Sequence, residues 1–393
     1  MKRLIPFFAI LAAAIVCICL VLFIRESPPD PTQSTAPPTT QMPTLPTVPT
    51  ESQTQPTETE PAPTETEPAP TETEPLPTET EPVILYTNPL TGEVLPALCE
   101  NRPYAVVFNN IQAAMPQYGI SNADILCEVL AEGGITRCLG IFHDISDTEA
   151  FGSIRSARPY FIQLAQGFDA ILVHAGASEE GNTYLKNSGW NNIDGVLGTN
   201  ASKYFYRDKD RLNAGYSLEH TLFIKSTGIQ TYAEKLGYAT TRPGGVDFGW
   251  QFGGSSALAG EAAGSITVYF GSGARSKSTS LVYDADDSLY YASQHGAAHI
   301  DGATGQQLSY RNVLVLKTGV KNQGDSAGHL TITTTGSGSG YYACDGRLIS
   351  IKWSRKSVTD PFIFTTEDGA PIVLGVGKTY LAIVPTNALF KNS

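Results

Sequence analysis

The sequence predicts an α+β protein, in which an N-terminal α/β-type layered domain is followed by a mainly antiparallel β domain, after a transmembrane helix and a disordered linker. Three observations support this fold class. An apolar segment opens the chain, a segment rich in Pro, Thr and Glu follows, and residues 83–393 carry short apolar runs separated by turn residues. Because these 311 residues exceed the usual size of one hydrophobic core, we expect two folded domains.

Residues 1–25 are predicted to form a signal anchor. The run from Leu4 to Ile24 is 21 residues long, uncharged and almost wholly apolar. A helix of this length spans a bilayer core at about 1.5 Å per residue. Lys2 and Arg3 precede the run, so the positive-inside rule places the N-terminus in the cytoplasm and the folded domains outside. We therefore expect a single-pass protein of the cell membrane.

Two other outcomes for this segment stay open, namely cleavage as a signal peptide and lipidation. A cleaved signal peptide normally has a shorter apolar region followed by small residues, and this sequence has neither feature. Cys17 and Cys19 follow Val16 and Ile18, whereas a lipidation signal places a small residue before the cysteine. The uncleaved anchor is the favoured interpretation.

Residues 26–82 are predicted to be a disordered linker. There is no Lys or Arg between Ser27 and Pro82, and a seven-residue repeat containing Pro-Thr-Glu-Thr-Glu-Pro begins at Pro56, Pro63, Pro70 and Pro77. Proline recurs in every copy of the repeat, which argues against a coiled coil. In a polyproline-like state the linker would reach on the order of 150 Å, enough to hold a domain away from a membrane.

Most of the negative charge lies in this linker. Residues 27–82 contain Asp30 and nine glutamates, whereas residues 83–393 contain 23 Lys and Arg against 27 Asp and Glu, a net charge of −4. A broad nucleic-acid-binding surface needs a strong basic excess. We therefore expect no nucleic-acid partner.

The first folded domain, residues 83–245, is predicted from an alternation of strands and helices. Such alternation implies a layered α/β or α+β arrangement. The predicted strands are Tyr104 to Asn109, Ile125 to Leu130, Ile135 to Phe142 and Ala170 to His174, and the predicted helices are Pro159 to Gln166, Glu179 to Asn187 and Gly228 to Leu236.

A glycine-rich interdomain linker, residues 246–264, is expected to precede the β-rich domain at 265–393. Turn pairs such as Asp345-Gly346 and Asp368-Gly369 separate its apolar runs. The predicted strands are Ile266 to Phe270, Thr279 to Tyr283, Leu289 to Ser293, Asn312 to Lys317, His329 to Thr334, Gly340 to Cys344, Leu348 to Lys352, Phe362 to Thr365 and Tyr380 to Val384.

Four cysteines lie outside the apolar segment, at positions 99, 127, 138 and 344, with no zinc-site spacing. Cys127 and Cys138 would face each other across the predicted hairpin if its turn centres on Glu132 and Gly133. If the turn centres on Gly133 and Gly134 they would not. A cross-strand disulfide and two buried free thiols are both open.

The stretch from Glu128 to Ser178 is the best candidate for a functional site. It places three arginines and two histidines among glycine turns and apolar runs, a concentration found nowhere else in the sequence. Several segments in and around this stretch resemble the YerB-like family. They are Arg102 to Asn110, Glu132 to Arg137, Gly152 to Arg158 and Val173 to Ser178. Members of this family are bacterial envelope proteins described as lipoproteins and built from a domain of unknown function with a C-terminal companion.

Later strings resemble the companion domain: His299 to Asp301, Asp345 to Arg347, Lys352-Trp353 and Gly377 to Thr379. The resemblance extends over roughly residues 85–385. It implies an extracytoplasmic location and supplies no catalytic residues.

An anion-binding site is the first functional hypothesis. Arg155 and Arg158 flank the predicted start of a helix, where guanidinium groups and free backbone N–H groups can converge on a phosphate, carboxylate or uronate. Arg137, His174 and Ser178 complete the candidate ligand-binding set. The competing interpretation is that Arg155 and Arg158 pair internally with Glu128, Glu132 or Asp144 and have only a structural role.

Hydrolysis is the more specific functional hypothesis. It assigns Glu132 and Asp144 as acid/base candidates and His174 as proton shuttle, since two carboxylates with separated pKa values can divide these roles. No motif predicts a metal ion or a cofactor. His295 and His299 have the spacing of helical metal ligands, but the glycines after Asp301 argue against a helix there.

Together these features predict a membrane-anchored extracytoplasmic envelope protein that binds an anionic cell-wall component or a protein partner without catalysis. The first alternative is a hydrolase or transferase acting on cell-wall glycans or their phosphates. The second is a purely protein-binding scaffold, favoured if the arginines are internally paired.

Overall fold

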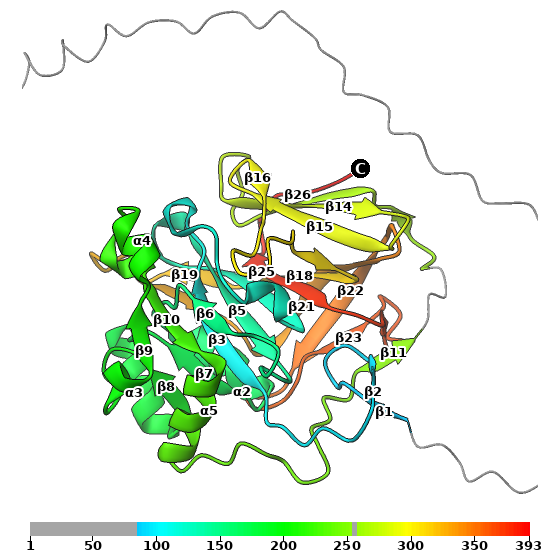
Figure 1. Cartoon of the computed structure of the whole chain (residues 1–393). Coiled ribbons are helices and arrows are strands. Elements are labelled where there is room, and N and C mark those ends of the chain that lie inside the picture. Colours follow the sequence, from blue (N-terminus) through cyan, green and yellow to red (C-terminus); the bar gives the residue numbers. More distant parts are fainter. Residues whose placement is uncertain (1–84, 254–257) are drawn as a thin grey trace, which may run out of the picture. The chain divides into compact units, whose positions relative to one another are not determined.

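A computed structural model describes residues 85–253 and 258–393. The predicted signal anchor and disordered linker lie outside these residues. Within the described ranges, every helix is too short or too polar to cross a bilayer. The structure has an α+β fold, as predicted, with strands outnumbering helices (Figure 1).

One 11-stranded mixed sheet organises the molecule. Its strand order is β12 (Glu261–Ala262), β22 (Arg347–Arg355), β21 (Gly336–Cys344), β18 (Asn312–Thr318), β25 (Thr379–Pro385), β4 (Ile125–Leu130), β5 (Thr136–Phe142), β3 (Tyr104–Asn109), β7 (Ile171–His174) and β8 (Asn192–Asp194), while β23 (Ile363–Thr365) pairs with β22. The central strands are buried along almost their whole length, which explains their nearly continuous apolar sequences.

Strand β25 joins the two halves of the chain at the middle of this sheet. It runs parallel to β18 on one side, with Leu314 opposite Leu381, and parallel to β4 on the other, with Leu381 opposite Cys127. Figure 1 shows β25 in red between elements of different colours. Strands from both sides of residues 246–264 share this one sheet. The division of the chain into two domains at these residues stays a prediction.

A smaller sheet of six strands is built from the C-terminal half and lies at one end of the molecule (Figure 1, yellow). It comprises β16 (Ala297–Ala298), β15 (Leu289–Gln294), β14 (Ser278–Asp284), β13 (Ser265–Tyr269) and β26 (Phe390–Asn392), with β17 (Ser309–Tyr310) pairing with β15. Its strands pair antiparallel and alternate between buried and exposed residues, as expected for a sheet with one solvated face.

The helices α2 (Pro159–Gly167), α3 (Glu179–Ser188) and α5 (Ser226–Lys235) lie near β7 and β8 (Figure 1, green). Helix α2 begins with a proline and is buried along most of its length. Helix α3 begins after Ser178, whose hydroxyl accepts the Gly181 N–H, and ends at Gly189 in the left-handed conformation. The others are α4 (Lys209–Asn213) and five 3-10 helices: η1 (Gln112–Ala114), η2 (Ile120–Asn122), η3 (Glu132–Gly134), η4 (Ala201–Lys203) and η5 (Leu218–His220).

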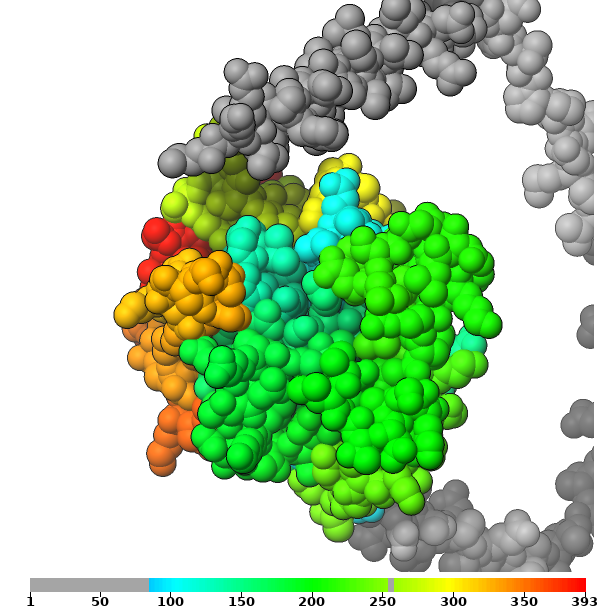
Figure 2. Space-filling view, turned by 90° about the vertical axis from the view of Figure 1, so that its left-hand side faces the viewer, coloured from blue at the N-terminus to red at the C-terminus, as the bar shows by residue number. Residues whose placement is uncertain are grey.

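Four small sheets complete the fold: β1 (Tyr86–Thr87) with β2 (Val94–Leu95); β6 (Ala150–Gly152), β10 (Leu222–Lys225) and β9 (Phe205–Arg207); β11 (Gln251–Gly253) with β24 (Val373–Gly375); and β19 (Val320–Asn322) with β20 (Leu330–Ile332). The β19–β20 hairpin projects from the surface beside the green part of the chain (Figure 2, orange-yellow).

The four cysteines within the described residues are free thiols. Cys127 lies opposite Leu139 and Cys138 opposite Glu128, so the two thiols are offset by one position across the β4–β5 hairpin. Of the two states that the sequence left open, the structure therefore has the buried free thiols.

Candidate functional site

Glu132, Arg137 and Arg158 form a partly buried charge cluster at the turn between β4 and β5. The Glu132 carboxylate accepts both Nε and Nη2 of Arg158, the latter at 2.9 Å, and lies 3.4 Å from Nη2 of Arg137. Arg137 also donates from Nη1 to the Ser156 carbonyl at 2.9 Å. For Arg158, the internal pairing considered as the competing interpretation is what the structure contains.

The electrostatics of this cluster keep Glu132 ionised. Burial opposes ionisation of Glu132, but the hydrogen bond from Arg158 and the charges of Arg137 and Arg158 outweigh it, so its pKa is lowered. Burial lowers the pKa of Arg137 to about 10, which leaves the guanidinium protonated at neutral pH. A carboxylate held in this way is a poor proton donor.

Asp144 is not near Glu132. Glu132 precedes β5 and Asp144 follows its end, so the seven-residue strand separates them by about 24 Å. Asp144 is exposed and accepts the backbone N–H of Ser146 at 2.9 Å. The proposed acid/base pair is therefore not assembled in this structure.

His174 and Ser178 have local structural contacts. His174 is fully buried at the end of β7, with Nδ1 2.8 Å from the Gly176 carbonyl oxygen and Nε2 3.1 Å from Oδ1 of Asn192. Ser178 caps α3. Neither contact involves Arg155, so the predicted convergence of these residues on one anion is not present.

Arg155 instead lines a separate groove of about 420 Å³, here called the arginine groove. Its remaining lining residues are Ile154, Ser156, Ala175, Gly176, Ala177, Val196, Leu197, Arg207, Glu219 and Leu222. The loops after β7 and β8 form one side, where Oδ1 of Asp194 accepts the backbone N–H groups of Gly176 and Val196 at 2.7 and 2.8 Å. Ligands of sheets with parallel strands commonly bind beyond the carboxyl ends of those strands, where this groove lies.

The charges in the arginine groove are two guanidinium groups and one carboxylate. Arg155 donates to Glu219 at 2.8 Å, while Arg207 donates to the Leu218 carbonyl at 2.6 Å. Burial lowers the pKa of Arg207 from its usual value. No sequence motif indicated Arg207 or Glu219, because they come from β9 and η5, more than 50 residues beyond Arg155.

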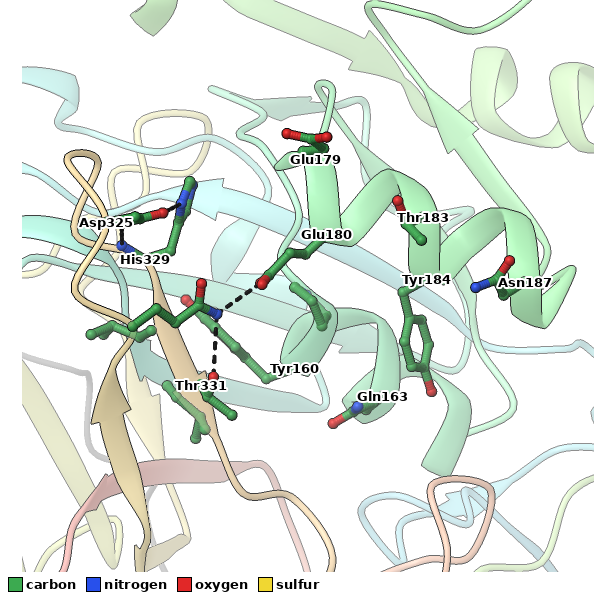
Figure 3. Close-up of a pocket in the computed structure, with 14 residues that line it drawn as sticks. Tyr160, Gln163, Glu179, Glu180, Thr183, Tyr184, Asn187, Asp325, His329 and Thr331 are labelled. Carbon is green, nitrogen blue, oxygen red and sulfur yellow. Dashed lines mark hydrogen bonds and ion pairs between the residues drawn. The ribbon is translucent and has the colours of Figure 1, made fainter.

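A second groove of about 620 Å³, the acidic groove, lies between α2 and α3 on one side and the β19–β20 hairpin on the other (Figure 3). Its acidic lining side chains are Glu179, Glu180 and Asp325, and His329 lies beside them. Gln323 bridges the two sides by donating to Glu180 at 2.8 Å and to Thr331 at 3.2 Å. No sequence motif indicated this groove, since its walls come from segments about 140 residues apart.

Glu128 lies away from both grooves in a buried network between the two halves of the chain. It accepts hydrogen bonds from Lys277 and Thr279 at 2.8 Å and from Tyr380 at 2.7 Å. Burial opposes its ionisation, but Lys277 and the hydrogen bonds lower its pKa overall. Across the described ranges, no three His, Cys, Asp or Glu side chains gather as a metal site requires.

The chain belongs to the DUF3048 family of proteins of unknown function: residues 90–239 match its N-terminal domain and residues 266–381 its C-terminal domain. This confirms the family resemblance predicted from the sequence.

The chain is 31% identical over 301 residues to "Putative lipoprotein YerB" of Bacillus subtilis (strain 168), which spans 76% of this chain and 86% of that protein. The crystal structure of YerB protein from Bacillus subtilis matches with a TM-score of 0.68 and 29% identity, over 78% of this chain and 100% of that one.

Proposed function

We propose that this protein is a membrane-associated envelope protein that binds an anionic component of the cell wall in the arginine groove, without catalysis. Membership of a family that includes a protein named as a lipoprotein supports the membrane association. In this proposal residues 1–25 anchor the chain as a single-pass helix with its N-terminus in the cytoplasm, and residues 26–82 hold the folded part away from the membrane.

The observation that carries the proposal is the excess positive charge of this groove. Arg155 and Arg207 present two planar sets of N–H donors suited to phosphate or carboxylate, against the single carboxylate of Glu219. Arg137 and Arg158, by contrast, are already paired with Glu132. The ligand contacts are therefore assigned to Arg155 and Arg207.

The Arg155–Glu219 pair is one that a ligand can open. The Glu219 side chain is 51% exposed and that of Arg155 is 25% exposed. Exposed ion pairs contribute only about 0–1 kcal/mol, because water and salt screen them. An incoming anion can replace Glu219 on Arg155 at little cost, whereas Arg158 would have to give up a less exposed, two-point contact with Glu132.

A protein partner at the same groove is the second candidate. Val196 and Leu197 line the groove with 57% and 69% of their surfaces exposed. Adjacent exposed aliphatic side chains on a loop are a common feature of protein-binding surfaces. Binding that persists on cell walls without anionic polymers would favour this candidate.

A hydrolase or transferase receives no support from the residues first assigned to it. Glu132 is held by two arginines and Asp144 lies at the other end of β5. The geometry favours binding over glycan cleavage.

Co-sedimentation with isolated cell walls tests the proposal, using residues 79–393, which form one compact unit. We expect wild-type protein to sediment with intact walls and not with walls stripped of anionic polymers. Each lost guanidinium contact should weaken binding about tenfold. An Arg155→Ala/Arg207→Ala variant with unchanged Tm should therefore remain largely in the supernatant.

Two matched variants sharpen this test. Glu219→Gln frees Arg155 and should tighten binding, whereas Lys225→Ala removes one exposed cation elsewhere and should leave it unchanged. Equal sedimentation of wild type and the double arginine variant would refute the assignment of the ligand to this groove.

A further inference from the structure

We propose that the acidic groove is a second, independent binding site, which takes an extended peptide through the ammonium group of a lysine-type side chain. Its volume of about 620 Å³ lies within the range of about 300–1,000 Å³ typical of ligand sites. The groove is also built from both family segments, because α2 and α3 belong to residues 90–239 and the hairpin to residues 266–381.

The charge of the groove selects a cation. Glu179, Glu180 and Asp325 place three carboxylates around it, and no Lys or Arg is among its lining residues. His329 is hydrogen-bonded to Asp325 on the hairpin. In the part of the chain that the structure describes, neither Glu179 nor Glu180 forms an ion pair.

The position of α3 explains only part of this charge. Acidic residues in the first turn of a helix are stabilised by the helix dipole, which accounts for Glu179 and Glu180. It does not account for Asp325, which faces the same groove from the hairpin (Figure 3). Glu180 accepts the Gln323 amide and Asp325 pairs with His329, so a cationic ligand would join or displace these contacts between the two walls.

Tyr160 gives an independent indication of a ligand. Its ring extends from α2 toward the hairpin (Figure 3), and the residue is only 2% exposed. Its hydroxyl has no hydrogen-bond partner among the described residues. An unpaired buried hydroxyl destabilises the fold, so a polar ligand group that hydrogen-bonds to Tyr160 would remove this penalty.

The hairpin favours a peptide over other amines. Four consecutive residues line the groove, namely His329, Leu330, Thr331 and Ile332. Strand β20 pairs with β19 alone among the described strands, so one edge of β20 has free backbone N–H and C=O groups. An extended peptide can pair with this edge, while Leu330 and Tyr184 contact the aliphatic part of its lysine side chain.

Charge excludes two other occupants. An anionic wall polymer would meet three carboxylates here, and residues 27–82 of this chain are acidic and contain no Lys or Arg. The acidic groove and the arginine groove therefore select opposite charges, and each can be tested without the other.

The test is a calorimetric titration of residues 79–393 with acetyl-Ala-Lys-Ala-amide and with the same peptide acetylated on its lysine. We expect saturable binding of the lysine peptide and at least tenfold weaker binding of the acetylated one. Glu180→Gln and Asp325→Asn should each weaken binding about threefold or more, since each removes half of the carboxylate pair that faces the ammonium group. Glu149→Gln, which removes an exposed carboxylate elsewhere, should have no effect.

Tyr160→Phe separates a binding role from a structural one. Removing an unpaired hydroxyl should leave Tm unchanged or higher, while the affinity for the lysine peptide falls. Absence of saturable binding, equal binding of the two peptides, or unchanged affinity in Glu180→Gln and Asp325→Asn would overturn the proposal. The Arg155→Ala/Arg207→Ala variant should bind the lysine peptide normally, so failure of either groove is detected separately.

Discussion

Protonation of the buried side chain of His299 should make the stability of this protein depend on pH. Its ring lies between the side chains of Gln117 and Gln294, with Nε2 2.8 Å from Oε1 of Gln117. Burial lowers its pKa from 6.5 to about 4. The side chain is therefore neutral in the folded protein over a range in which the unfolded chain is protonated.

We predict that this residue makes the protein less stable in mild acid. Because the folded pKa is depressed, the contribution of His299 is fully present above pH 6.5 and is lost as pH falls toward 4. The loss should be on the order of 3 kcal/mol. Urea unfolding at several pH values would measure it.

His299→Gln is the matched control, since it keeps a polar side chain that does not titrate. As pH falls from 6.5 to 4, the free energy of unfolding should decrease more for wild type than for the variant. Asp124 acts in the opposite direction, because burial raises its pKa to about 6 and its contribution is lost as pH rises. Both proteins contain Asp124, so its effect cancels in the difference between their free energies of unfolding. If that difference did not change with pH, the prediction would be contradicted.

Sequence analysis identified some of the residues of the candidate site but not the ion pairs that they form. It identified the segment from Glu128 to Ser178, which supplies Glu132, Arg158 and Arg155. It could not show that Arg158 faces Glu132 while Arg155 faces Glu219, because side-chain direction depends on how β5, α2 and η5 pack. Glu128 was considered as a partner for Arg155 or Arg158, yet its partner is Lys277, 149 residues away.

At the scale of elements, local sequence signals were largely sufficient. The predicted strands at 104–109 and 125–130 coincide with β3 and β4, and the predicted helix at 159–166 ends one residue before α2 does. The order of strands in the sheet could not be derived in this way. The parallel pairing of β25 with β4 joins positions about 250 residues apart and leaves no periodic signal in either strand.

The ion pair between Lys277 and Glu128 joins the segment between β13 and β14 to strand β4. The Lys277 side chain is 8% exposed and that of Glu128 is 3% exposed, with 2.8 Å between Nζ and Oε1. We predict that Lys277→Met costs about 3–5 kcal/mol, since it leaves a buried carboxylate without its cation. Urea denaturation would measure the change.

The double variant Glu128→Gln/Lys277→Met distinguishes this cause from lost packing. It removes both charges, so it should be more stable than Lys277→Met alone. A cost below about 1 kcal/mol for Lys277→Met would contradict the prediction.

At the scale of the whole molecule, the two family segments are expected to depend on each other. We predict that residues 79–245 and 264–393, expressed separately, do not unfold cooperatively. The first piece loses the partner of β4 and the groups that bind Glu128, and the second loses one neighbour of β25. Circular dichroism during urea titration would measure this, with residues 79–393 as the control. Cooperative unfolding of either piece would instead support independent domains divided at 246–264.

The place of β25 in the sheet also bears on the order in which the protein forms during its synthesis. A ribosome releases the chain from its N-terminus, so β4 and β5 are complete long before β25, which ends eight residues from the C-terminus. Until then the apolar edge of β4 has no neighbour and is open to pairing with other chains. The edge of β4 is therefore covered only after β25 has been made and has paired with it.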